Sequence, residues 1–98
     1  MAEPVYKFFR AKWTEAWYQL SQAEQDAHMA KIGQAFEKVG GKRIILCESA
    51  WSSEPWQIWG VEEFPNSEAA QRYAALLAEI NHSRYIEGET MLGTKWET

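Results

Sequence analysis

Two side chains in this sequence, His28 and Tyr73, are of types that transfer protons or hold a reacting oxygen near neutral pH. His28 lies one position before Met29 and four before Ile32, which places it at the edge of a helical apolar stripe, within reach of a cavity. Tyr73 falls near the centre of another helix's apolar face, so its buried hydroxyl needs a partner. We predict both as catalytic candidates. The alternatives are a half-buried histidine bonded to backbone or carboxylate, and a core tyrosine.

Tryptophan is unusually frequent, with six in 98 residues. Trp13 and Trp17, with Tyr18 beside them, flank a connection from strand to helix. This set would form the mouth of a ligand cavity, or else a lid over a small core. Trp56 and Trp59 are three apart on one predicted strand and should point to opposite faces. We predict Trp13, Trp17, Tyr18 and Trp59 as ligand-binding residues.

Arg10 is a further ligand-binding candidate. It lies in the middle of an aromatic-rich strand, where an unpaired charge would be costly to bury. A carboxylate on a neighbouring strand, such as Glu62 or Glu48, would satisfy the guanidinium. Otherwise it is available for an anionic ligand.

Histidine and cysteine form no pattern typical of a metal site. His28 and His82 lack carboxylates at ligand spacing, and His82 is expected on the surface. Cys47 is the single cysteine, so it forms no disulfide within the chain, and its apolar neighbours indicate a small buried side chain. We predict no metal and no cofactor. Haem would need a histidine lining a cavity larger than this small domain is expected to contain.

Charge and hydropathy exclude two classes of partner. A formal charge of −4 argues against nucleic acid, which selects clustered Lys and Arg. No apolar stretch approaches the ~18 residues that suggest a membrane span, and the start Met-Ala-Glu-Pro has no signal-peptide pattern. We therefore expect a cytoplasmic protein that binds neither nucleic acid nor membrane.

The first half of the chain predicts a strand followed by a helix. Residues 5–13 are rich in aromatic residues and favour a strand. Ser21 and Glu24 have the spacing of a capping box, so a helix should start there and run to about Val39, before Gly40-Gly41. Its buried stripe is predicted to be Met29, Ile32, Phe36 and Val39.

The second half predicts two strands, a helix and a final strand. Strands are expected over 43–51 and 56–64, joined by a loop at 52–55, and Asn66 or Ser67 should cap the next helix. A turn at Gly88 should precede the last strand, 90–97. The inward face of that helix is predicted to be Ala69, Tyr73, Leu76, Leu77 and Ile80.

The order βαββαβ favours an α+β, ferredoxin-like sandwich, in which two helices cover one face of an antiparallel four-stranded sheet. We expect one domain spanning residues 1–98. A solvated sheet face should alternate polar with apolar residues, whereas both sides of strand 5–13 carry aromatic residues. We therefore predict a homodimer that packs through the helix-free sheet face.

This order, together with the segments 13–21 and 59–66, resembles the dimeric α/β-barrel superfamily. That group includes antibiotic-biosynthesis-type monooxygenases, muconolactone-isomerase-like proteins and stress-responsive barrel proteins. The resemblance implies a dimer of paired sheets with a small hydrophobic cavity between sheet and helices in each subunit. It carries over no catalytic residue, because no position here matches a catalytic motif of those enzymes.

These observations favour a small dimeric protein with a hydrophobic, aromatic pocket for a small apolar or aromatic ligand. The alternative is a cofactor-independent monooxygenase, isomerase or cyclase acting on a small aromatic or polyketide-like substrate. The sequence leaves open whether the protein is an enzyme.

Overall fold

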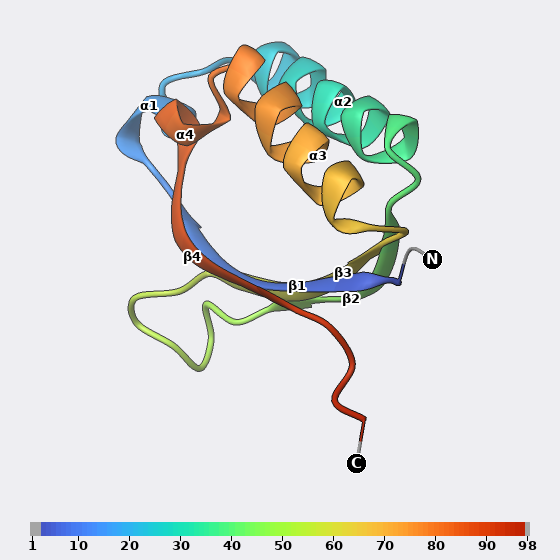
Figure 1. Cartoon of the computed structure of the whole chain (residues 1–98). Helices are drawn as coiled ribbons and strands as arrows, with labels where there is room; N and C mark the ends of the chain where they lie inside the picture. Colours follow the sequence, from blue (N-terminus) through green and yellow to red (C-terminus); the bar gives the residue numbers. More distant parts are fainter. Residues whose placement is uncertain (1–2, 98) are drawn as a thin grey trace.

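A computed structural model describes residues 3–97 of the chain, so residues 1, 2 and 98 of the expected domain lie outside it. The elements are β1 (Val5–Trp13), α1 (Glu15–Tyr18), α2 (Gln22–Lys38), β2 (Lys42–Glu48), β3 (Ile58–Phe64), α3 (Ser67–Glu79), α4 (His82–Tyr85) and β4 (Ile86–Gly93). The strands form an antiparallel sheet in the order β2-β3-β1-β4, and α2 and α3 lie across one side of it (Figure 1). The predicted α+β ferredoxin-like architecture is confirmed.

β1 lies at the centre of the fold because it pairs with both β3 and β4. Its odd positions, from Val5 to Trp13, face the helices, and its even positions face away, since side chains alternate along a strand. We call these sides the inner face and the outer face. On the outer face the register aligns Ile45, Val61, Phe8 and Met91 across all four strands. We call this line the apolar row.

Helix α2 begins where its sequence predicts. The Ser21 hydroxyl accepts the Glu24 backbone N–H, and the Glu24 carboxylate accepts the Ser21 N–H, so the capping box is present. Its buried face differs from the prediction at one position, because His28 is buried while Met29 is 45% exposed. His28, Ile32 and Val39 follow one another at four and seven residues, which is one and two helical turns, and face inward.

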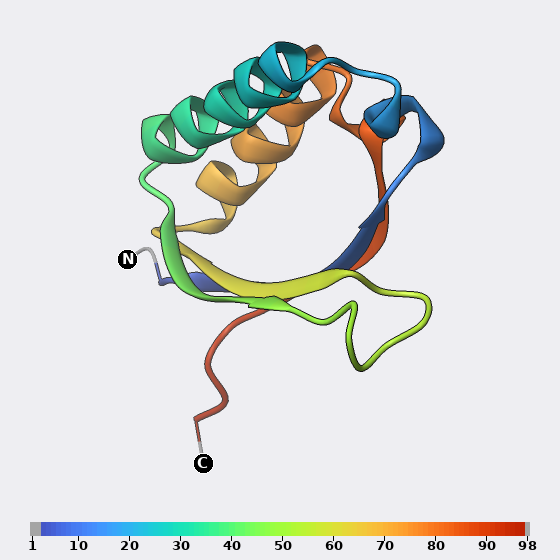
Figure 2. The same ribbon diagram turned by 180° about the vertical axis from the view of Figure 1, so that it is seen from behind.

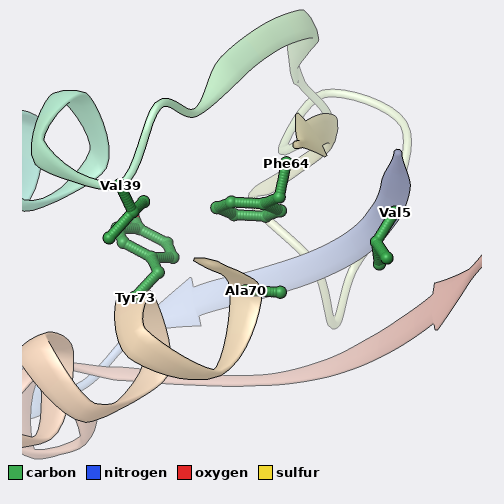
Figure 3. Close-up of a cluster of buried hydrophobic side chains, with 5 residues drawn as sticks. All are labelled: Val5, Val39, Phe64, Ala70 and Tyr73. Atoms are coloured by element: carbon green, nitrogen blue, oxygen red, sulfur yellow. The ribbon is translucent and has the colours of Figure 1, made fainter. Parts of the chain in front are cut away.

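The core lies at the end of the sheet where β1 begins. Phe64 is fully buried and lies in one cluster with Val39 at the end of α2 and Tyr73 of α3 (Figure 3). Val5 and Ala70 complete this cluster. The Phe64 and Tyr73 ring centroids are 5.5 Å apart. This packing fixes α3 above the sheet, and the Asn66 side chain caps its first turn as predicted, by accepting the Ala69 N–H.

The predicted strand ends were wrong between β2 and β3. The connection spans residues 49–57 rather than 52–55, because the chain turns as soon as it leaves β2. The Ser49 carbonyl accepts the N–H groups of Ser52 and Ser53, and the Ser49 hydroxyl donates to the Trp56 carbonyl. The connection protrudes from the outer side of the sheet (Figure 2).

The last strand was also predicted out of place. β4 covers Ile86–Gly93 rather than 90–97, and Gly88 lies inside it opposite Ala11 rather than in a turn. A Cβ atom on Gly88 would come within 3.0 Å of the Ala11 Cβ. Glycine at this position therefore permits close approach of two strands.

We predict that Ser21→Ala lowers the free energy of unfolding by about 1 kcal/mol, because the Glu24 N–H loses its acceptor at the helix start. Chemical denaturation followed by circular dichroism measures the change. Gln22→Ala, one position inside the exposed first turn, is the control and should have little effect. Equal losses in the two variants would contradict a role for the capping box.

Candidate functional site

A pocket of about 460 Å³ opens between the connection that follows β1 and the inner side of β2. Trp13 and Tyr18 form one wall, and Leu46 and Ile58 form the sheet side. We call it the inner pocket. Its lining residues are Trp13, Tyr18, Leu46, Cys47, Glu48, Ala50, Gln57 and Ile58. The pocket is thus walled by aromatic and aliphatic groups, with Glu48 and Gln57 as polar members.

Gln57 positions the aromatic wall of the inner pocket. Its side-chain oxygen accepts the Trp13 backbone N–H at 2.8 Å, and its side-chain nitrogen donates to the Tyr18 hydroxyl at 3.1 Å. Its own backbone N–H donates to the Ala11 carbonyl. Because the Tyr18 oxygen accepts from Gln57, the Tyr18 proton is available to a ligand.

Behind Trp13 lies a set of stacked rings that we call the aromatic–histidine cluster. Trp13 and Trp17 stack with ring centroids 4.1 Å apart, and the edge of Trp17 meets His28 at 5.9 Å. His28 Nε2 and His82 Nδ1 are 2.9 Å apart, and Tyr85 packs against His28 at 4.8 Å. His82 is therefore half-buried against His28, and its predicted surface position was wrong.

The two histidines are held in their neutral forms. Burial, with smaller contributions from the nearby His28 and Lys7, lowers the pKa of His82 to about 4. Burial and Lys31 lower the pKa of His28. In a neutral pair the N–H of one ring donates a hydrogen bond to the bare nitrogen of the other, whereas two charged rings at this distance would repel each other.

A buried ion pair on the inner face was missed by the sequence analysis. Lys7 Nζ lies 3.8 Å from Glu62 Oε1 and 5.1 Å from the centroid of the Tyr73 ring. Glu62 is 3% exposed, and burial raises its pKa although Lys7 and Arg43 oppose the shift. Burial also lowers the pKa of Lys7. Burial, and to a smaller extent the charge of Glu62, raises the pKa of Tyr73, so its phenol stays protonated. The sequence held one signal for it: Lys7 lies two residues after Val5 in the same strand, so the two side chains point to the same face.

A second pocket, of about 290 Å³, lies on the outer face beneath the 49–57 connection. We call it the outer pocket. Its lining residues are Phe8, Arg10, Ser49, Ser52, Ser53, Trp56 and Trp59. Trp56 and Trp59 therefore share one pocket, and the prediction of opposite faces was wrong, because Trp56 precedes β3 and is not part of the strand.

Arg10 has a different partner from those predicted. Its Nε and Nη2 donate to Glu89 Oε1 at 3.0 and 2.6 Å, and its guanidinium lies 5.0 Å from the centroid of the Trp56 ring. Glu62 and Glu48, the predicted partners, lie on the inner face. Since β4 is the neighbour of β1 on that side, Glu89 is directly opposite Arg10.

The structure distributes the predicted site residues over four places. Trp13 and Tyr18 line the inner pocket, and Arg10 and Trp59 line the outer pocket. Trp17 and His28 belong to the aromatic–histidine cluster, whereas Tyr73 packs in the core with Phe36 and Phe64. His28 and Tyr73 thus occupy separate clusters, and neither is among the residues lining the two pockets. Their catalytic roles stay predictions.

The sequence matches no known family model and no curated protein. Solved structures do match. A variant of chlorite dismutase from Candidatus Nitrospira defluvii superposes with a TM-score of 0.78 at 9% identity, over 100% of this chain and 42% of that one. A haem-binding protein from Thermus thermophilus gives 0.74 at 17% identity, over 98% and 41%. The chain therefore shares the ferredoxin-like fold of these proteins.

The chain spans less than half the length of those two proteins. It is closer in size to the RPA0582 protein of unknown function from Rhodopseudomonas palustris, with a TM-score of 0.65 at 14% identity, over 100% of this chain and 86% of that one. At such identities the likeness establishes the fold. Across residues 3–97, no helix is long and apolar enough to cross a membrane, and no three His, Cys, Asp or Glu side chains are grouped to hold a metal ion.

We predict that acid destabilises the fold through the histidine pair. A lowered pKa in the fold means that stability is fully present above the unfolded value of 6.5 and is lost as pH falls from there through about 4. Because the His82 ring is partly exposed and screened by solvent, we expect it to contribute a loss of about 1 kcal/mol between pH 7 and pH 5. Denaturant titrations at pH 7, 6 and 5 measure it. His82→Phe should lose distinctly less stability than the wild type over this range, and an unchanged pH dependence would refute the assignment.

Proposed function

We propose that this protein is a homodimer, paired through the outer sheet faces, that binds a small aromatic or apolar molecule in the inner pocket of each subunit. The observation that carries the proposal is the inner pocket itself. Trp13, Tyr18, Leu46 and Ile58 give it an apolar wall, and about 460 Å³ falls within the roughly 300–1,000 Å³ typical of small-molecule sites. We also propose that the protein acts in the cytoplasm.

The polar groups indicate which ligands the pocket favours. Tyr18 has a proton to donate, because Gln57 occupies its oxygen. Glu48, also in the lining, supplies an acceptor. The proposed ligand is therefore an aromatic molecule carrying a hydrogen-bond acceptor such as a carbonyl, which Tyr18 would meet while the ring packs against Trp13.

The amount of exposed surface supports a dimer. The chain exposes 6935 Å², whereas a compact protein of 11.4 kDa exposes about 5,800 Å². The excess, about 1,100 Å², is of the order that one partner buries in a standard interface, ~800 Å². The apolar row offers a suitable centre, since Phe8, Ile45 and Met91 are 37%, 46% and 68% exposed.

Haem, which one of the structural neighbours binds, does not fit the residues present. An axial histidine needs a ring nitrogen directed into a cavity. His28 and His82 instead face each other at 2.9 Å, among the rings of Trp17 and Tyr85. Neither histidine lines the inner or the outer pocket. We therefore assign no role to haem.

Two neighbours on β2 separate ligand binding from dimerisation. Leu46 and Ile45 are both 46% exposed, and they lie on the inner and outer faces respectively. We predict that Leu46→Ala weakens binding of 2-acetonaphthone roughly tenfold while leaving the dimer unchanged, because it removes pocket wall. Ile45→Ala should instead weaken the dimer. Tryptophan quenching and sedimentation equilibrium read the two properties.

A pocket role fails if the wild type does not bind aromatic probes, or if Leu46→Ala and Ile45→Ala alter binding equally. The dimer proposal fails independently if the wild type is monomeric at micromolar concentration. The two halves of the proposal are therefore tested separately by the same pair of variants.

The ligand class is tested at Tyr18. We predict that Tyr18→Phe weakens 2-acetonaphthone about fivefold, which corresponds to one net hydrogen bond of about 1 kcal/mol. Binding of 2-ethylnaphthalene, which lacks the carbonyl, should change little. Equal effects on both compounds would show that Tyr18 acts through packing and would remove the carbonyl from the proposed ligand.

A further inference from the structure

The C-terminal segment exposes a large aromatic side chain to solvent. After Gly93 the described chain continues as coil to Glu97, and Trp96 within it is 83% exposed. The segment leaves the sheet on the side away from α2 and α3 (Figures 1 and 2). A large aromatic ring held in water on the same side as the apolar row indicates a contact with another surface.

The length of this segment matches the spacing of two packed sheets. Trp96 lies three residues beyond the end of β4, and extended chain covers at most about 3.3–3.6 Å per residue. At full extension it spans about 10 Å, which is also the distance between two sheets packed face to face. The segment is therefore long enough to bring the Trp96 ring to the level of a sheet lying against the outer face.

The 49–57 connection, which covers the outer pocket, and this segment lie at opposite corners of the sheet. Gly93 pairs with Tyr6 near the start of β1, on the β4 edge. The 49–57 connection follows Glu48 at the β2 edge, beyond the Glu48–Ile58 pair at the other end. In near-orthogonal sheet packing, a twofold axis along the other diagonal exchanges these two corners. The segment of one copy then meets the connection of its partner.

The chemistry of the outer pocket suits an indole ring. Its volume of about 290 Å³ is just below the roughly 300 Å³ at which drug-sized sites begin. Phe8, Trp56 and Trp59 give it aromatic walls, and the Arg10 guanidinium, held by Glu89, offers a cation to a ring face. Serines of the 49–57 connection provide oxygens for an indole N–H.

We propose that the C-terminal segments are exchanged in the dimer, so that Trp96 of each copy fills the outer pocket of the other. Each outer pocket is complete only when the second copy is present. The proposal rests on the dimer proposed above, and it adds the residue that locks the two copies together.

Trp96→Ala tests the energetic part of the proposal. Loss of a buried aromatic anchor at an interface should weaken the dimer roughly 10- to 100-fold in dissociation constant, measured by sedimentation equilibrium. Lys95→Ala, which changes the adjacent side chain of the same segment, is the control and should shift the constant less than about twofold. An unchanged constant in Trp96→Ala overturns the proposal.

A cross-link tests the geometry. In a background with Cys47→Ser, the pair Trp96→Cys and Ser52→Cys should give a covalent dimer on a non-reducing gel. The control pair, Trp96→Cys with Ser83→Cys on α4, should not. A cross-link formed within one chain, or none in a protein that is still dimeric, overturns the exchange and leaves the sheet-face dimer standing. A wild type that is monomeric at micromolar concentration removes both proposals.

Discussion

The antiparallel pairing of β1 with β3 and β4 is the constraint on which the rest of the structure depends. Because side chains alternate along the nine residues of β1, this pairing places successive side chains in two different environments. The odd positions carry Val5 into the core, Lys7 into an ion pair and Trp13 into the wall of the inner pocket. The even positions place Phe8 and Arg10 on the outer face. A shift of the register by one residue would exchange all of these roles.

The inner face departs from a simple apolar core. Lys7 and Glu62 face each other beneath the helices, and within residues 3–97 the Glu62 Oε1 atom has no hydrogen-bond partner. Burying such a pair costs desolvation that its attraction only partly offsets. The packing of Phe64, Tyr73 and Val39 at one end of the sheet stabilises the fold against this weaker middle. At the other end, stacked rings take the place of aliphatic packing.

Local signals were readable from the sequence, and long-range ones were not. Strand 5–13 and the Ser21 capping box follow from neighbouring residues, and the structure has both. The partner of Arg10 depends instead on the strand order β2-β3-β1-β4, which puts Glu89 beside it although 79 positions separate them. The meeting of His28 with His82 has the same origin, since it needs α2 and α4 to be brought together. The end of β2 was missed because the hydrogen bonds of Ser49, rather than β-propensity, stop the strand there.

The place of β1 also has a consequence for the time course of folding. Tyr6 pairs with Gly93, 87 positions away in the chain, so the sheet cannot be completed until almost all of the sequence is free to fold. Folds dominated by such distant pairings form slowly. On the ribosome, β1 must wait with one edge unpaired while the rest of the chain is synthesised, and exposed strand edges invite association with other chains. The central position of β1 therefore leaves one of its edges open to other chains until β4 has been synthesised.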